Sequence, residues 1–250
     1  MRVTVIVPVL YRELQLERTL SHLARLRPDL DLEILVVVDV PDPSREAEAR
    51  DANEGVAGPC GARAVYRVGQ RGFGSALRLG FTEARGDVMV PFMGDESDRP
   101  EDIPLMVREL ERGLDVVAGS RYMRGGKTVG VTTKQRLSHL YSILVRLAGG
   151  PNIHDVSNAF KAYRRQVVES VPTEADSFDI SVELTVKAAL AGFRVGEIPT
   201  EWTNRQLGGS NFRVGRELSN YRRWLLLAAR GRLRPGNGRR GTTPAPGSER

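Results

Sequence analysis

Short runs of β-branched apolar residues alternate with longer amphipathic segments through the first 120 residues of the chain. A buried parallel strand has the first pattern because both of its faces are covered, and a helix that packs on a sheet has the second. The runs predict strands at residues 2–9, 32–38, 64–68, 88–92 and 115–118, and a further short strand is predicted at 194–198. Because helical segments separate them, the pattern predicts a doubly wound, mostly parallel sheet of the α/β class.

The composition is typical of one globular domain with a sizeable core. The chain has 250 residues, of which 40% are hydrophobic and 27% charged. The single cysteine, Cys60, supports neither an internal disulfide nor a cysteine metal site, which favours the reducing cytoplasm. We find neither the pattern of a signal peptide nor an apolar run of the ~18–20 residues that a membrane span needs.

The positive charge of the chain is concentrated near its C-terminus. The formal net charge is +6, and residues 211–250 contain ten arginines and two glutamates, which leaves −2 for residues 1–210. This distribution disfavours nucleic acid as a partner and indicates a basic appendage that meets an anionic surface. We therefore divide the chain into a domain at 1–210, a helix at 211–234 and a disordered Pro/Gly-rich tail at 235–250.

The C-terminal helix is basic and amphipathic and carries Tyr221 and Trp224 on its apolar side. Such a helix is a candidate for lying in a membrane interface, which would place the protein peripherally on the inner face of the membrane. The alternative is a helix that packs on its own domain. A second amphipathic helix is predicted at residues 134–148, with Leu137, Leu140, Tyr141, Leu144 and Leu147 on one side.

An acidic loop follows the predicted strand at residues 88–92. Gly94 ends the apolar run, Asp95 and Asp98 follow, and Pro100 opens the next helix. Open α/β sheets bind ligands at the carboxyl ends of their strands, and carboxylate oxygens suit Mg²⁺ or Mn²⁺, which sit on one or two carboxylates plus substrate phosphates. The alternative is a solvated loop in which Asp98 or Ser97 caps the helix.

Other polar residues are expected at the same edge of the sheet. Asp39 ends the strand at 32–38, and Gly72 and Gly74 open a helix, where backbone amides can approach phosphate unless the glycines only close a tight turn. A basic loop with Arg121 follows the strand at 115–118. Arg121 either holds phosphate oxygens beside the acids or is simply exposed. The polar loop at 203–210 is a candidate lid over a charged ligand.

In this order, the segments resemble the family 2 glycosyltransferases and, within them, the dolichyl- or polyprenyl-phosphate mannosyltransferases and glucosyltransferases. The resemblance runs over residues 2–212 and is carried by 116–126 (VVAGSRYMRGG), 155–165 (DVSNAFKAYRR), 178–183 and 205–210 (RQLGGS). It implies the GT-A (nucleotide-diphospho-sugar transferase) fold. It also implies a metal-dependent, inverting transfer of a hexose, mannose or glucose, from a GDP- or UDP-sugar to a polyprenyl or dolichyl phosphate.

The resemblance also implies roles for individual residues, carried over by position. Donor-binding residues would be Pro8, Asp39, Gly72, Gly74, Asp95, Arg205 and Ser210. Acceptor-phosphate residues would be Arg121, Lys134, Arg136 and Ser138. Metal ligands would be Asp95, Ser97 and Asp98, and the catalytic residues would be Asp95, Arg121 and Asp98.

The chain departs from the family pattern at two positions of the metal motif. Met93 replaces the first aspartate of the DxD motif and Ser97 replaces a common glutamine, so metal binding falls to Asp95 with help from Asp98. One alternative is a sugar or small-molecule hydroxyl acceptor, which needs a base such as Asp98, Asp155 or Glu183. The other is a nucleotide-sugar-binding protein whose catalysis is weakened.

Overall fold

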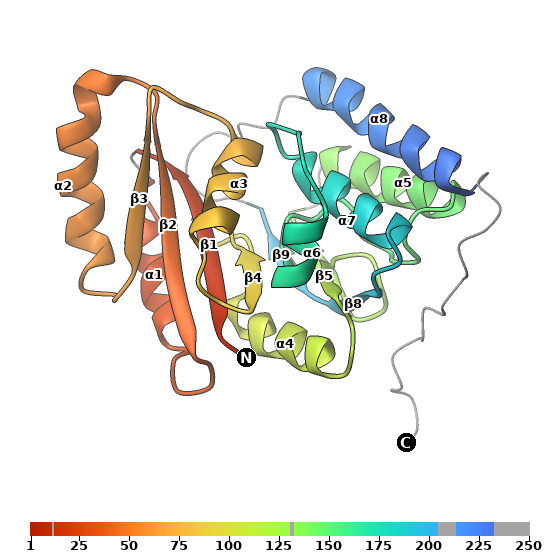
Figure 1. The fold of residues 1–250 in the computed structure, drawn as a ribbon, viewed down its shortest axis with the longest axis horizontal. Helices are drawn as coiled ribbons and strands as arrows, with labels where there is room; N and C mark the ends of the chain where they lie inside the picture. Colours follow the sequence, from red (N-terminus) through yellow and green to blue (C-terminus); the bar gives the residue numbers. More distant parts are fainter. Residues whose placement is uncertain (12, 131–132, 205–213, 233–250) are drawn as a thin grey trace.

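The computed structural model describes residues 1–11, 13–130, 133–204 and 214–232. Seven strands form one sheet in the order β3-β2-β1-β4-β7-β5-β8 (Figure 1). Their bounds are β1 Val3–Leu10, β2 Leu32–Val40, β3 Arg63–Val68, β4 Val88–Pro91, β5 Val116–Ser120, β7 Lys161–Arg164 and β8 Val195–Pro199. Six of the seven strands run parallel to one another, which confirms the predicted mostly parallel α/β sheet.

Helices cover both faces of this sheet. One face packs against α1 (Leu16–Ala24), α2 (Glu46–Ala57) and α4 (Ile103–Glu111). On the other face, one apolar cluster includes side chains of α3 (Phe73–Glu83), α5 (Thr133–Leu147), α6 (Arg165–Ser170), α7 (Ile180–Leu190) and α8 (Val214–Arg232). In β1, Val5 and Val7 face the first layer and Ile6 the second, as the two-residue period of a strand requires. Burial on both faces explains why this strand is apolar apart from Thr4.

One strand of the sheet was not predicted. β7 runs antiparallel between β4 and β5, opposite Met89 on one side and Val117 on the other. Since β7 is antiparallel to both neighbours, β4 and β5 are parallel to each other, and their carboxyl ends lie at the same edge of the sheet as those of β1 and β2. A separate pair of short strands, β6 (Lys127–Val129) and β9 (Glu201–Thr203), was also not predicted. Two 3₁₀ turns, η1 (Pro43–Arg45) and η2 (Pro100–Asp102), precede α2 and α4.

The C-terminal helix α8 packs on the domain. Figure 1 shows it beside α5 and α7, at the end of the sheet opposite α2. Tyr221, Trp224 and Ala228 are buried, and the indole Nε1 of Trp224 donates to Oδ2 of Asp179 at 2.8 Å. The aromatic residues that indicated a membrane interface therefore face the protein core, as the alternative interpretation of this helix predicted. Among the described helices, none combines the length and apolarity needed to cross a bilayer.

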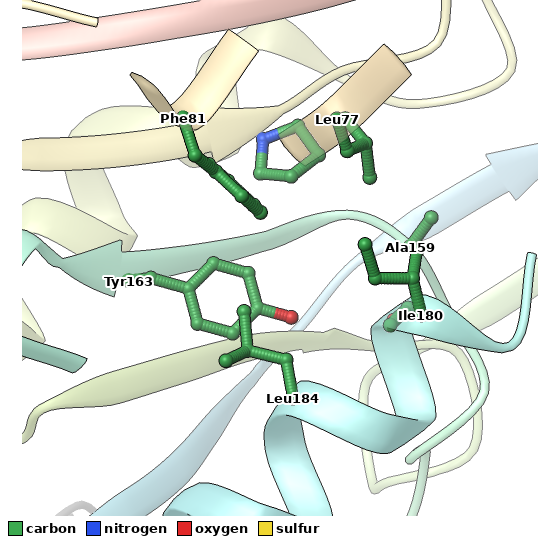
Figure 2. A pocket seen from close by; sticks show the side chains of 8 residues that line it. Leu77, Phe81, Ala159, Tyr163, Ile180 and Leu184 are labelled. Carbon is green, nitrogen blue, oxygen red and sulfur yellow. The ribbon is translucent and has the colours of Figure 1, made fainter. Parts of the chain in front are cut away.

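Helix α7 and helix α3 meet over a seam of apolar side chains. Figure 2 shows Leu77 and Phe81 of α3 facing Tyr163 and Leu184 across this seam. The side chains leave no room for a water molecule between them. The seam is therefore part of the packed core and offers no space to a ligand.

Candidate active site

The acidic loop, residues 94–98, follows β4 and is fixed from two sides. On one side, Thr19 Oγ1 of α1 donates to the carbonyl of Gly94 at 3.1 Å. On the other, the amide of Thr203 in β9 donates to the carbonyl of Ser97 at 2.9 Å. These bonds hold the loop at the carboxyl end of the sheet, where its position after a strand had predicted it.

Glu96 ties the same loop to α1 by its side chain. Its carboxylate lies 2.8 Å from Arg18 Nε and 2.8 Å from His22 Nδ1. Glu96 has a φ of +57°, a left-handed conformation that is uncommon for a residue other than glycine. Such strain costs on the order of 1–3 kcal/mol and persists where surrounding contacts hold the backbone in place. The turn leaves Asp95 and Asp98 buried on the protein side of the loop.

Asp98 is a buried carboxylate with an unsatisfied oxygen. Its side chain is 4% exposed, and Oδ1 has no hydrogen-bond partner in the described part of the chain. Burial and the neighbouring Asp95 raise the pKa of Asp98 to about 7, although Arg121 opposes this shift. A cation beside Asp95 and Asp98 would reduce the repulsion between the two carboxylates and give Oδ1 of Asp98 a partner. The two carboxylates therefore fit a divalent metal ion.

The ligand set for such an ion is small. Within the described residues, no group of three or more His, Cys, Asp or Glu side chains could hold a metal. Ser97 is buried, and its amide donates to Asp95 Oδ1 at 3.2 Å, so it orients that carboxylate. Two carboxylates suit Mg²⁺ in particular, which usually takes one or two of them together with substrate phosphates and water.

Arg121 follows β5 and is paired with Asp155. The guanidinium Nε lies 2.6 Å from Oδ2 of Asp155, and Nη2 lies 3.0 Å from Oδ1. Asp155 is fully buried, and its pairing with Arg121 lowers the pKa of Asp155 despite burial. The charge of Arg121 also acts on Asp98, so the arginine and the acidic loop belong to one site. The alternative of a merely exposed Arg121 is excluded, since its side chain is 9% exposed.

A set of hydroxyl groups surrounds the guanidinium of Arg121. Nη2 donates to Ser138 Oγ and Ser157 Oγ, both at 3.1 Å, and the ring of Tyr122 lies 4.9 Å away. Of the residues expected to bind the acceptor phosphate, the structure thus brings Arg121 and Ser138 together. Lys134 and Arg136 lie in the first turn of the same helix, α5, and their side chains are exposed.

Asp39 is also engaged by protein groups. It accepts hydrogen bonds from Arg67 Nη1 at 2.7 Å and from the amide of Gly72 at 2.8 Å. Burial raises the pKa of Asp39, and these two donors oppose the shift. The amide of Gly74 donates to the carbonyl of Asp176 at 3.0 Å. Both glycine amides therefore have protein acceptors, which favours the tight-turn interpretation of this glycine cluster.

The other residues expected to bind the donor are Pro8, Arg205 and Ser210. Pro8 lies inside β1, opposite Val37 of β2, two residues before the strand ends. Arg205 and Ser210 lie outside the described residues.

Several residues of the site were not predicted, or were given another role. Arg67 orients Asp39, and Ser157 contacts Arg121. Lys161 is fully buried and donates to Ser181 Oγ at 2.6 Å, and burial lowers the pKa of Lys161 to about 7. Asp155 was considered only as a base, but it forms the ion pair with Arg121. The run DVSNAFK contains Asp155, Ser157 and Lys161, so the signal was present in the sequence.

Glu183 has a structural role in the described chain. It is fully buried, accepts hydrogen bonds from the amides of Glu174 and Ala175, and pairs with Lys187 Nζ at 2.6 Å. It therefore caps a loop between α6 and α7 and does not take part in the site. Asp155 and Glu183 are both paired with cations of the protein. Of the three residues considered as a base, this leaves Asp98.

Comparisons to known proteins identify the family of this chain. The family model described as "Glycosyl transferase family 2" matches residues 4–171, and the chain belongs to this family. The chain is 32% identical over 228 residues to "Dolichol-phosphate mannosyltransferase" of Pyrococcus furiosus, covering 90% of this chain and 63% of that protein. It is 32% identical over 241 residues to "Undecaprenyl-phosphate mannosyltransferase" of Micrococcus luteus, covering 91% and 96%.

Solved structures share the fold. Glucosyl-3-phosphoglycerate synthase from Mycobacterium tuberculosis, in complex with Mg²⁺ and uridine diphosphate, matches with a TM-score of 0.65 and 18% identity, covering 91% of this chain and 77% of that one. A complex of the same enzyme with Mn²⁺, uridine diphosphate and phosphoglyceric acid matches with a TM-score of 0.63 and 20% identity, covering 91% and 76%. These likenesses confirm the GT-A fold.

Proposed function

We propose that this glycosyltransferase moves a hexose of the mannose or glucose type from a GDP- or UDP-sugar to the phosphate of a polyprenyl or dolichyl lipid. The relatives support this proposal, because their names describe mannosyl transfer to dolichol, undecaprenyl and polyprenol phosphates. The lipid acceptor implies a peripheral position at a membrane, on the side where the nucleotide sugars are found, and no role for nucleic acid.

One observation carries the proposal. The two buried acids Asp95 and Asp98 lie beside Arg121, whose side chain is 9% exposed, at the carboxyl edge of the sheet. Acids and an arginine in one site suit a substrate that brings both a metal ion and phosphate groups. A nucleoside diphosphate donor and a phosphate acceptor have these groups.

We assign the metal ion, Mg²⁺ or Mn²⁺, to Asp95 and Asp98, with Ser97 orienting Asp95. When bound, the ion neutralises the charge that develops on the leaving nucleoside diphosphate. Asp39 is the residue assigned to the nucleotide, and Arg67 and Gly72 fix the direction of its carboxylate. Pro8, Gly72, Gly74, Arg205 and Ser210 complete the proposed donor site.

Arg121 and Ser138 are assigned to the acceptor phosphate, with Lys134 and Arg136 at its entrance. Nη1 of Arg121 donates to none of the described residues, so it can donate to a phosphate oxygen while Asp155 holds Nε and Nη2. A lipid phosphate is already an anionic nucleophile at neutral pH, so the transfer needs little help from a base. Direct in-line attack inverts the anomeric carbon and requires no covalent glycosyl-enzyme.

A transfer assay tests this function. Purified protein is incubated with GDP-mannose, UDP-glucose or UDP-galactose, with a short-chain polyprenyl phosphate, and with Mn²⁺ or Mg²⁺. We expect one donor to yield a polyprenyl-phosphate hexose and to raise the melting temperature only in the presence of metal. If no donor is transferred to any lipid phosphate, the proposed function is wrong, and donor binding without turnover would identify the weakened nucleotide-sugar-binding protein instead.

A hydroxyl acceptor is the second candidate, and Asp98 favours it. A carboxylate with a pKa of about 7 has the strength of a general base near neutral pH, and a sugar hydroxyl, unlike a phosphate, must lose a proton when it attacks. The same assay with sugar and small-molecule alcohols as acceptors separates the two candidates.

A further inference from the structure

Four leucines of α5 lie in a row on the outside of the molecule. The leucine row consists of Leu137, Leu140, Leu144 and Leu147, which are 48%, 52%, 43% and 64% exposed. Their spacing of three, four and three residues places them within an arc of about 80° on the helix, at 100° per residue. Other exposed large apolar residues, such as Leu14 and Leu105, lie on separate elements.

The opposite side of α5 holds the helix on the domain. Gln135, Ser142 and Val145 are buried there, and Ser138 contacts Arg121. Tyr141 donates its hydroxyl to the carbonyl of Tyr221 in α8 at 2.9 Å. The leucine row is therefore not needed for packing within the described chain, and a continuous exposed apolar strip of this kind marks an interaction surface.

The charged residues of α5 are all positive. Helix α5 contains Lys134, Arg136 and Arg146 and no acidic residue. At 100° per residue, Lys134 and Arg136 flank the leucine row, whereas Arg146 lies toward the opposite side of the helix. Helix α8, which packs alongside, exposes Arg222 and Arg230 around the half-exposed Leu226. An apolar strip with a basic border is complementary to an anionic lipid surface, where apolar side chains enter the boundary region and cations contact phosphates.

Two other occupants fit this surface less well. In a symmetric dimer formed by the leucine row, the same patch of each copy meets the other, so the basic residues of the two copies would face one another. The segment 233–250 contains one large apolar residue, Leu233, so it cannot supply an apolar partner for four leucines.

We propose that α5 docks this protein on an anionic bilayer, with the leucine row in the headgroup boundary and Lys134 and Arg136 on lipid phosphates. The proposal deepens the proposed function, on which it rests, because the helix that carries the leucine row also presents Ser138 to Arg121. A lipid phosphate held at the membrane surface would thus enter the site beside the helix that contacts the membrane. The docking element is α5, whereas the sequence had indicated the C-terminal helix.

Vesicle sedimentation of the full-length protein tests the docking surface. The wild type, the double variant Leu140→Gln with Leu144→Gln, and the control double variant Leu14→Gln with Leu105→Gln are each mixed with phosphatidylglycerol or phosphatidylcholine vesicles, without donor or acceptor. We expect the wild type and the control to bind phosphatidylglycerol vesicles, and the α5 variant to lose at least about tenfold in partitioning. Circular dichroism and urea unfolding establish that each variant is folded.

Other results would overturn the docking proposal. These are equal binding of the α5 variant and the wild type, or no binding of the wild type to either vesicle. A third is a sedimentation-velocity result in which the only effect of the α5 substitutions is to dissociate a dimer. Transfer to a water-soluble short-chain acceptor should be equal in all three proteins, and transfer to an acceptor in vesicles should fall only in the α5 variant. Vesicle binding without any transfer would contradict the proposed function and leave the docking surface intact.

Discussion

Asp155 holds Arg121 by two hydrogen bonds, from Nε to Oδ2 at 2.6 Å and from Nη2 to Oδ1 at 3.0 Å. The amide of Arg121 also donates to Oδ2 of Asp155, at 3.2 Å. These contacts fix the plane of the guanidinium before any substrate arrives. Under the proposed function, Asp155 is a positioning residue, which leaves the remaining nitrogen of Arg121 for the acceptor phosphate.

Removing the charge of Asp155 should destabilise the protein. Asp155→Asn leaves the buried Arg121 without its counter-ion, and breaking a buried pair in this way costs about 3–5 kcal/mol. Urea unfolding measures the loss. Glu46→Gln, which removes the exposed pair with Arg50, is the control and should change the free energy of unfolding by less than about 0.5 kcal/mol. Equal effects of the two variants would contradict the buried pairing.

Removing the charge of Asp95 should abolish metal-dependent transfer. Asp95→Asn removes one of the two carboxylates assigned to the ion, and we expect kcat/KM to fall by about a hundredfold or more, because Lewis-acid stabilisation is worth several kcal/mol. Steady-state kinetics and Mn²⁺ titration calorimetry measure the change. Glu101→Gln, an exposed acid just beyond the loop, should behave as the wild type. Full activity of Asp95→Asn would show that the metal lies elsewhere.

In the metal-free protein, the contribution of Asp98 to stability should decrease as the pH rises from about 4 to about 7. The pKa of Asp98 is 3.8 in its reference state and about 7 when folded, so within this window the unfolded chain has lost a proton that the folded protein keeps. The free energy of unfolding then decreases with increasing pH. Urea unfolding at several pH values should give a shallower decrease for Asp98→Asn. An unchanged slope would mean that Asp98 is ionised throughout.

Metal binding should show the opposite dependence on pH. A proton on Asp98 competes with the ion, so the affinity for Mn²⁺ should fall as the pH decreases below about 7. Calorimetric titration at pH 6 and pH 8 measures this. Equal affinities at the two values would contradict a role for Asp98 as a ligand.

Gly74 should not tolerate a side chain. A Cβ at this position would lie 2.1 Å from the carbonyl oxygen of Ala175, so the backbone must shift in Gly74→Ala, at a cost of about 1–3 kcal/mol or more. Gly55 in α2 has open space around the same position, and Gly55→Ala should stabilise its helix by about 0.5–1 kcal/mol. Thermal unfolding of the two variants should therefore shift in opposite directions. A neutral Gly74→Ala would mean that the segment at 175–176 moves easily.

The sequence predicted the strands that are long and apolar throughout, because their burial on both faces leaves an unmistakable pattern. It did not predict β7, whose four residues include the buried Lys161, because so short and polar a segment has no readable period. The acidic loop was placed correctly because it interrupts an apolar run. The partner of Arg121 was not, since Asp155 lies 34 residues away and no local pattern connects them.

The two amphipathic helices show a second limit of sequence patterns. Helical spacing identifies an apolar side, but it does not tell which neighbour covers that side. The apolar side of α8 is covered by α5 and α7, whereas the leucine row of α5 is uncovered in the described chain. The glycine cluster has the same ambiguity, because tight turns and phosphate-binding turns share their composition and differ in the partners of their amides.

The bond between Trp224 and Asp179 bears on where the catalytic unit ends. A shortened protein that stops near residue 210 would lack Trp224, so Asp179, at the start of α7, would lose its hydrogen-bond donor. It would also expose apolar side chains of α5 and α7 that α8 now covers. Such a fragment should aggregate or express poorly even though every residue assigned to chemistry is retained. We therefore expect the smallest unit that folds by itself to extend through residue 232, and shortened versions for crystallisation or assay should keep this helix.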